Sequence, residues 1–553
     1  MPSITKQKMD RYTYIYNSMS YWDKENKRPD NYKKSIGKID NETGEKEYKQ
    51  HYIDKLKLEG KPTNGMKIWV DGRKKVTNEG SISQDDFSDI SNKILGTVKD
   101  YGVAYFLQAI TEKTGLLNLL GNIFPQTWGK IVVLAYYLIS SDKPVMYCND
   151  WYEENEFVDV GSMVSQRVSE LLASFGHKER LGFYKQWYSH IQENEYIALD
   201  ITSVSSYSKN IECLEWGYNR DGEDLPQANI CMLFGEKSQL PIYQTFYSGS
   251  LCDVSTLETT LAEFSAITDT KDIILIMDKG FYSEKNVRML LDKKGGRNYK
   301  FILPVSFSSN FAKNLTDTVR EGIDSIENVI FSHGSIIRGT HKTIKWKNTG
   351  AELHAHIFYN PEKATKDRND LYNYVANLKT KAGKDPENKK LQKEYKRYLV
   401  VDNPENANGN ILATIRKDEV EKTLKTAGWF ILISNHICDT QTAYDIYRAK
   451  DVVEKSFFQY KNNLGINRFH VHNDERMKNK TFIAFIALIL SCHIHKIMKE
   501  KEMDKHMTFE KLLITLKKIK SAHINGNIIL RPLTKEQKSI FKNFDIQLPK
   551  FTG

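Results

Sequence analysis

The sequence predicts an α/β fold in which a mixed β-sheet is flanked by helices. Between residues 195 and 305, short apolar segments of strand length alternate with segments of helical spacing, which is typical of a sheet covered by helices. A further apolar segment at residues 427–435 has the length of a buried strand and follows a long interruption. We therefore expect one sheet whose strands come from two stretches of sequence separated by a large insertion.

The composition is that of an ordinary globular protein. The chain has 553 residues, of which 40% are hydrophobic and 27% are charged. This length is enough for about three or four domains. These fractions exclude wholesale disorder.

The first 192 residues contain two kinds of pattern. Residues 11–40 alternate with period two on either side of a polar turn at residues 24–30, which predicts a β-hairpin. Residues 101–192 have apolar positions at helical spacing. Such a helical block is either a helix-turn-helix DNA reader or a packing scaffold, and the pattern alone leaves both open.

The central stretch predicts three meandering strands followed by a strand–helix–strand unit. Its first strand begins at residue 195 and is expected to end at Asp200, and a later buried strand is expected to end at Asp278. After the first strand, the expected order is strands at 228–235 and 240–250, a helix at 256–267, a strand from 272 that ends at Asp278, a helix at 283–295 and a strand at 299–307.

An insertion then interrupts the sheet before residues 427–435 resume it and residues 440–463 form a helix. Two strands, at 341–348 and 352–360, and a charged helical stretch at 364–398 are expected inside the insertion. The expected regions are an N-terminal β-rich region (1–95), a helical candidate DNA-binding region (96–192), the first part of the core (193–305), the insertion (306–426), the second part of the core (427–500) and a basic, helical C-terminal region (501–553).

Positive charge is concentrated near the C-terminus. The formal net charge is +10, and residues 451–553 contain 19 basic and 10 acidic residues. Residues 361–400 of the insertion add 11 basic and 6 acidic residues. This distribution fits a polyanionic partner such as DNA, although a solvated lysine-rich face would give the same counts.

Two aspartates are placed where buried strands are expected to end. An ionised carboxylate beside a buried strand needs a compensating partner, and strand ends are also where open α/β sheets bind ligands. Two such carboxylates on neighbouring strands repel each other, so a divalent cation with oxygen ligands is a natural compensation for Asp200 and Asp278. The alternative is that both residues cap helices or turns.

A third acid lies on the helix predicted at 440–463. Tyr447, Lys450, Glu454 and Lys461 are separated by three, four and seven residues, which brings them near one helical face. That face combines a carboxylate with cations suited to phosphate. An exposed helix acid with no function is the alternative for Glu454.

The order Asp200, Asp278, Glu454 resembles the DDE insertion-sequence transposases, which have an RNase H-like catalytic core. More narrowly, the chain is similar to the group with a Y-x2-R-x3-E-x6-K signature, matched here by Tyr447, Lys450, Glu454 and Lys461. Lys450 replaces the expected arginine, which keeps the charge and loses the bidentate geometry. The resemblance covers residues 11–500.

The resemblance implies that Asp200, Asp278 and Glu454 are catalytic and bind two Mg²⁺ or Mn²⁺ ions. It implies cleavage at transposon ends and joining of those ends to target DNA by a homodimer, with double-stranded DNA of the inverted-repeat ends and the target as partners. It also implies that Tyr447 and Lys461 contact phosphate, assisted by Lys450. A metal-dependent nuclease without strand transfer and an inactive DNA-binding remnant are the alternatives.

Two further residues are candidates for DNA contacts. Trp346 in the insertion is either a stacking platform for a flipped base or a buried core residue. Arg468 follows the glutamate helix and is placed to follow the DNA backbone.

The six cysteines are scattered without paired spacing, which favours a reducing compartment. The N-terminus has no apolar signal-peptide core, and the longest apolar run, at residues 482–490, is shorter than a membrane span requires. We therefore expect a cytoplasmic, nucleoid-associated protein of bacterial type with no membrane partner.

Overall fold

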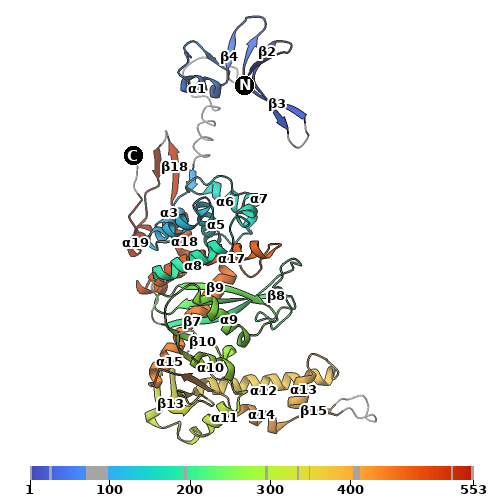
Figure 1. Ribbon diagram of the computed structural model, residues 1–553, viewed down its shortest axis with the longest axis vertical. Coiled ribbons are helices and arrows are strands. Elements are labelled where there is room, and N and C mark those ends of the chain that lie inside the picture. Colours follow the sequence, from blue (N-terminus) through green and yellow to red (C-terminus); the bar gives the residue numbers. More distant parts are fainter. Residues whose placement is uncertain are drawn as a thin grey trace. The chain divides into compact units, whose positions relative to one another are not determined.

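The computed structural model divides into two compact units, Met1–Asp89 and Ile90–Gly553 (Figure 1). The predicted domain boundaries at residues 95 and 192 and part of the polar turn at 24–30 lie outside the described residues. The structure describes residues 3–23, 28–69, 98–191, 196–292, 297–332, 335–347, 349–402, 412–524 and 527–549.

The first unit is built on a five-stranded sheet in the order β1-β2-β3-β4-β5. The predicted hairpin is confirmed, because β2 and β3 pair antiparallel, with a bulge between Ile15 and Tyr16. A short helix follows β4 and buries Ile53 and Leu56. The elements of this unit are β1 (Ser3–Lys8), β2 (Tyr12–Asp23), β3 (Arg28–Asp40), β4 (Lys46–Tyr48), α1 (Gln50–Leu58) and β5 (Lys67–Ile68).

The second unit is organised around a nine-stranded mixed sheet in the order β12-β13-β14-β17-β11-β10-β7-β8-β9. This confirms the predicted α/β class with helices against a mixed sheet (Figure 1). The strands are β7 (Tyr196–Ser205), β8 (Gln227–Gly235), β9 (Pro241–Ser248), β10 (Asp272–Met277), β11 (Asn298–Pro304), β12 (Val329–Ser332), β13 (Ser335–Lys345), β14 (Glu352–Tyr359) and β17 (Trp429–Ser434).

The pairing follows the predicted meander and strand–helix–strand unit. Strands β7, β8 and β9 pair antiparallel in succession, and β10 lies parallel to β7 and to β11. Strand β17 returns antiparallel between β11 and β14, so the sheet resumes after the insertion as expected.

The insertion is divided between two structures. Strands β12, β13 and β14 extend the main sheet, while the remaining elements enclose a small separate core around Val375, Leu378 and Tyr395. That small core is formed by α12 (Pro361–Lys384), α13 (Gln392–Tyr398), β15 (Leu399–Asp402), β16 (Leu412–Ile415) and α14 (Lys417–Leu424).

The remaining helices pack on the sheet or around the long helix α17. Nine consecutive residues of α5, from Ile131 to Ile139, are buried, so this helix of the 96–192 block is a packing element. The helices are α3 (Gly102–Lys113), α4 (Leu116–Ile123), α5 (Trp128–Ser140), α6 (Cys148–Glu154), α7 (Ser165–Leu171), α8 (His177–Ile191), α9 (Asp253–Ser265), α10 (Glu284–Leu291), α11 (Asn310–Asp317), α15 (Thr440–Ala449), α16 (Asp451–Phe458), α17 (Asp474–Glu500), α18 (Phe509–Lys517) and α19 (Lys535–Asn543), with the short turns η2 (Lys279–Phe281) and η6 (Gln459–Asn463).

Helix α17 is the central helix of this unit. Every residue from Asn479 to Cys492 is buried. Among the described residues it is the one helix long and apolar enough to cross a membrane, but 78% of its most apolar window is buried inside the protein. That burial is the position of a core helix.

The C-terminal region is not wholly helical. Helix α18 ends at Lys517, and the chain then turns into strand β18 (Lys520–Ile524). Strand β18 pairs with β19 (Asn527–Leu530) and with β6 (Val98–Asp100) in a three-stranded sheet. Because β18 pairs with a strand some 420 residues away in sequence, the local pattern of residues 501–553 did not predict it.

The two faces of the main sheet are covered by different helices. Asp200 and Gln244 share one face through the β7–β8–β9 register, and Tyr460 of η6 donates from Oη to Gln244 Oε1 at 3.0 Å. The Thr260 hydroxyl of α9 lies 2.7 Å from that of Tyr247, which is three positions from Gln244 and so faces the other side. The helix that carries Glu454 therefore covers the face onto which Asp200 points.

The contact of α8 with α17 depends on a buried polar network. Asn479 is fully buried, and its Nδ2 donates to the carbonyls of Leu172, at 3.0 Å, and Phe175, at 2.7 Å. Its Oδ1 accepts from Arg180, which is 6% exposed and also pairs with Glu475. Removing one member leaves buried polar partners without hydrogen bonds.

We expect Asn479→Leu to lower the free energy of unfolding by about 3 kcal/mol, because it removes one hydrogen-bond acceptor from the buried Arg180 guanidinium and leaves two carbonyls unsatisfied. Urea unfolding followed by circular dichroism measures this loss. The double variant with Arg180→Leu should recover part of it, since both buried polar partners are then removed. Simple additivity of the two losses would contradict the network.

Candidate active site

Asp200 lies within β7, an interior strand of the sheet between β10 and β8. Strand β7 was expected to end at this residue, and that expectation is wrong, because β7 continues to Ser205 alongside β8. Polar residues after Asp200 have hydrogen-bond partners on neighbouring segments. For example, the buried Ser203 hydroxyl donates to Asn229 Oδ1 at 3.1 Å. The apolar pattern of the sequence therefore predicted an end of β7 that lies before its end in the structure.

The Asp200 side chain is 17% exposed and is set among buried residues. The Ile201 backbone N–H donates to its Oδ1 at 2.9 Å. Burial raises the pKa of Asp200 from 3.8 to about 6, although Lys450 opposes this rise. The fold therefore keeps this carboxylate buried, although its ionised form is more stable in water.

Asp278 comes next to Asp200 because β10 runs parallel to β7. Met277, the last residue of β10, is the register partner of Leu199, so the residues that follow each of them are neighbours. The turn η2 begins directly after Asp278 and contains Gly280. A Cβ at Gly280 would collide with the Asp253 carboxylate, so a larger residue here would displace that side chain.

Glu454 approaches the two aspartates from helix α16, which covers the face of the sheet onto which Asp200 points. The predicted helix is interrupted, since α15 ends at Ala449 and α16 begins at Asp451, with Lys450 between them. In α16, Val453 and Phe457 are buried, whereas Phe458 is 63% exposed.

The Lys450 ammonium lies between the three acids. Its Nζ is 3.3 Å from Asp278 Oδ1, 3.7 Å from Glu454 Oε1 and 3.9 Å from Asp200 Oδ2. The lysine side chain is 4% exposed. Burial by itself would lower the pKa of Lys450, but the three carboxylates outweigh it, so that pKa is raised. The structure thus brings the three predicted acids together around one cation.

The three carboxylates form an oxygen-only donor set of the kind that hard divalent cations take. Among the described residues, no group of three or more His, Cys, Asp or Glu side chains is already arranged to hold a metal ion. The three acids are linked by Lys450, whose ammonium lies within 4 Å of an oxygen of each. Their chemistry fits a divalent cation, and the position between them holds an ammonium group.

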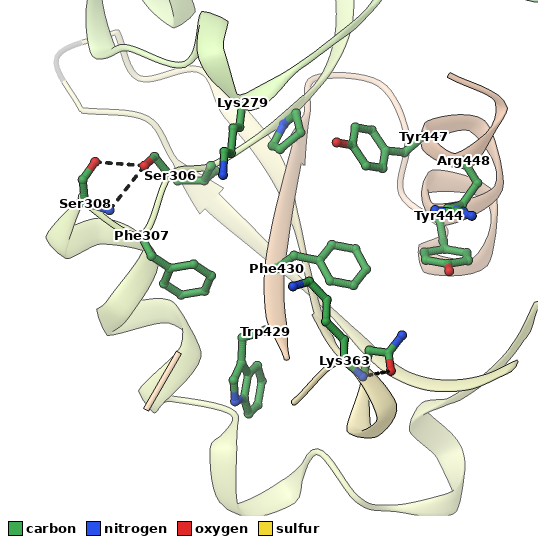
Figure 2. Close-up of a pocket in the computed structure, with 13 residues that line it drawn as sticks. Lys279, Ser306, Phe307, Ser308, Lys363, Trp429, Phe430, Tyr444, Tyr447 and Arg448 are labelled. Carbon is green, nitrogen blue, oxygen red and sulfur yellow. Dashed lines mark hydrogen bonds between the residues drawn. The ribbon is translucent and has the colours of Figure 1, made fainter. Parts of the chain in front are cut away.

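A cavity of about 510 Å³ opens beside the acids (Figure 2). Tyr447 of α15 lines it together with Lys279, the residue after Asp278. Burial, followed by the nearby Asp278 charge, raises the pKa of the Tyr447 phenol, so the ring stays neutral at ordinary pH. The other cations of the lining are Lys363 and Arg448 and the other aromatic residues are Phe307, Trp429, Phe430 and Tyr444.

Three predicted DNA-binding residues lie apart from this cavity. Lys461 donates to Asp221 at 2.7 Å and is 9% exposed, and Arg468 pairs with Glu223. Trp346 is 7% exposed and packs edge-on against Phe311. A stacking role for Trp346 does not fit this position, because its ring is part of the core.

The cations of the cavity and all of its aromatic residues except Tyr447 were not predicted from the sequence. Lys279 could have been found from its place directly after Asp278, and Trp429 from its place at the start of the resumed strand. Lys363 lies in the first turn of α12, more than 80 residues before Tyr447. No local pattern relates Lys363 to the acids.

Comparison with known proteins places the acids within a described domain. Residues 192–490, more than half of the chain, match the family model of the transposase DDE domain. No curated protein shows a significant match. A solved structure titled as the piggyBac transposase synaptic complex with hairpin DNA is similar at a TM-score of 0.36 and 9% identity, over 71% of this chain and 70% of that one. A likeness at this level carries no argument.

The raised pKa of Asp200 predicts a pH-dependent cost in stability. Because the folded-state value of about 6 exceeds the ordinary 3.8, the stabilising contribution of this carboxyl is present below pH 4 and is lost as the pH rises through 6. In buffer without divalent ions, we expect Asp200→Asn to be more stable than the wild type at pH 7.5, by up to about 3 kcal/mol. The difference should vanish near pH 4.

Denaturant unfolding at several pH values measures this difference. Asp269→Asn, the same substitution at an exposed position, serves as the control. A wild-type protein more stable than Asp200→Asn at pH 7.5 would show that the attraction of Lys450 outweighs the cost of burying this carboxylate.

Proposed function

The chain belongs to the transposase DDE domain family, and we propose that it is a DNA transposase that cleaves insertion-sequence ends and joins them to target DNA. The observation that carries the proposal is the meeting of Asp200, Asp278 and Glu454 around one buried cation. These acids come from two strands and a helix that are separated by as many as 254 positions in sequence. Their convergence has no evident structural need, since three like charges repel one another.

In this proposal, the three carboxylates hold the divalent cations. When bound there, Mg²⁺ or Mn²⁺ supplies Lewis acidity at the phosphodiester and lowers the pKa of a nucleophilic water or 3′ hydroxyl. Asp200 is fixed by its strand and by the Ile201 N–H. Asp278 and Glu454, with side chains 38% and 64% exposed, face the solvent from which DNA approaches.

The cavity beside the acids is suited to the nucleotides next to the cleaved bond. Its cations, Lys279, Lys363 and Arg448, complement phosphate, and its rings offer surfaces for a base. Figure 2 shows that Tyr447 of α15 and Lys279 of η2 both line this cavity. We assign the stacking role to this aromatic lining in place of Trp346.

We also propose that the chain belongs to the Y-x2-R-x3-E-x6-K group. Tyr447 lines the cavity, where a phosphate contact is open to it. Lys450 faces the acids and Lys461 faces Asp221, so neither ammonium points to a phosphate site in the protein without DNA.

Asp278→Asn should abolish metal-dependent cleavage of a DNA fragment carrying the element's ends, by at least a thousandfold, because it removes a charged oxygen ligand. Asp272→Asn, at the exposed start of the same strand, should cleave like the wild type. Gel analysis with Mg²⁺ and then Mn²⁺ measures both. Undiminished cleavage by Asp278→Asn would refute the assignment.

Pre-cleaved ends supplied with target DNA distinguish the alternatives. A transposase joins the two molecules, whereas a metal-dependent nuclease without strand transfer leaves them separate. A DNA-binding remnant would bind the ends and show neither reaction.

Lys363→Gln should weaken binding to end DNA about threefold to tenfold and reduce the slope of affinity against salt by about one, since one phosphate contact is lost. Lys366→Gln lies on the same helix outside the cavity lining and makes the same change in charge. Fluorescence anisotropy at several salt concentrations measures both. Equal effects would show that only overall charge matters.

A further inference from the structure

Lys450 occupies the position that the three carboxylates share. Its side chain is buried along its length, and its ammonium is within 4 Å of an oxygen of each acid. In the described part of the chain it is the cation common to all three. A buried lysine surrounded by three carboxylates acts first as their counter-ion.

We propose that Lys450 is the resident counter-ion of the catalytic carboxylates and that divalent metal ions bind by taking its place. This inference rests on the proposed metal-dependent function. Its basis is positional, because the ammonium contacts the same oxygen-bearing groups that a cation would contact. An ammonium and a divalent ion cannot share that position without strong repulsion.

The charges explain why a counter-ion is needed without metal. Three carboxylates at this spacing repel one another, and Asp200 is also removed from water. One ammonium cancels a single charge, so a net charge of about −2 stays and continues to attract divalent ions. The site is therefore compensated enough to remain assembled and negative enough to accept metal.

The identity of the residue and its place in the fold suit an exchange. Lysine carries a compact charge on a flexible four-carbon stem, whereas arginine grips carboxylates with a rigid fork. Lys450 also lies at the junction of α15 and α16, outside the body of either helix. Its side chain can move without breaking a helix.

The opening to solvent is on the side of the acids. Asp278 and Glu454 have side chains 38% and 64% exposed, in contrast to 4% for Lys450. An incoming ion therefore meets the carboxylates first and the ammonium behind them. The lysine acts as a positioning residue that holds the acids together and sets how tightly metal binds.

The test compares Mn²⁺ binding in the full-length protein without DNA, using the electron paramagnetic resonance signal of unbound Mn²⁺. Lys450→Met removes the charge and keeps a stem of similar length. Lys450→Arg keeps the charge. Lys455→Met, on the same helix and exposed, is the matched control.

We expect Lys450→Met to bind Mn²⁺ at least tenfold more tightly than the wild type, because no ammonium has to be displaced. Lys455→Met should stay within twofold of the wild type, and Lys450→Arg should bind no more tightly than the wild type. Without metal, Lys450→Met should also unfold at a lower temperature, and Mn²⁺ should raise that temperature more than in the wild type.

Unchanged or weaker Mn²⁺ binding by Lys450→Met would overturn the exchange, as would tighter binding by Lys450→Arg. Failure of the proposed function looks different, since Asp278→Asn would then leave Mn²⁺ binding as it was. If Asp278→Asn abolishes binding while Lys450→Met does not strengthen it, the metal site stands and the counter-ion role is wrong.

Discussion

The electrostatic balance between three carboxylates and the Lys450 ammonium is the constraint on which the second unit depends. Each acid comes from a different element, so the balance exists only when β7, β10 and α16 are all in place. The parallel register of β7 and β10 makes the two aspartates neighbours. The sheet then requires a helix on one particular face to deliver both the third acid and the cation.

That helix is held by contacts that do not involve the acids. Tyr460 of η6 is fully buried, and its hydroxyl lies within hydrogen-bond distance of Gln244 Oε1 and of the Thr481 carbonyl. Thr481 belongs to α17, which also packs against α5 and whose Asn479 accepts a hydrogen bond from Arg180 of α8. The central helix therefore links the helical block to the catalytic face. A loss of packing far from the acids is expected to reach them by this route.

Much of this architecture could be predicted because strand length and alternation are local properties of the sequence. The order of strands around Asp200 and Asp278 and the return of β17 followed from apolar segments and their spacing. The end of β7 did not, since Ser203 and Ser205 are buried polar residues satisfied by partners on neighbouring segments. The cations of the cavity and the burial of Trp346 also depend on tertiary contacts, which no single segment records.

The distribution of charge has a structural meaning as well as a functional one. Basic residues after position 450 pair with acids from earlier segments, as Lys461 does with Asp221, Arg468 with Glu223 and Lys520 with Asp100. Part of the excess positive charge in residues 451–553 therefore forms ion pairs that hold this segment against the rest of the unit. Because these side chains already have carboxylate partners, DNA must either displace those partners or rely on other cations. The same holds for two cations of the cavity lining, since Lys363 pairs with Asp367 and Arg448 with Asp451.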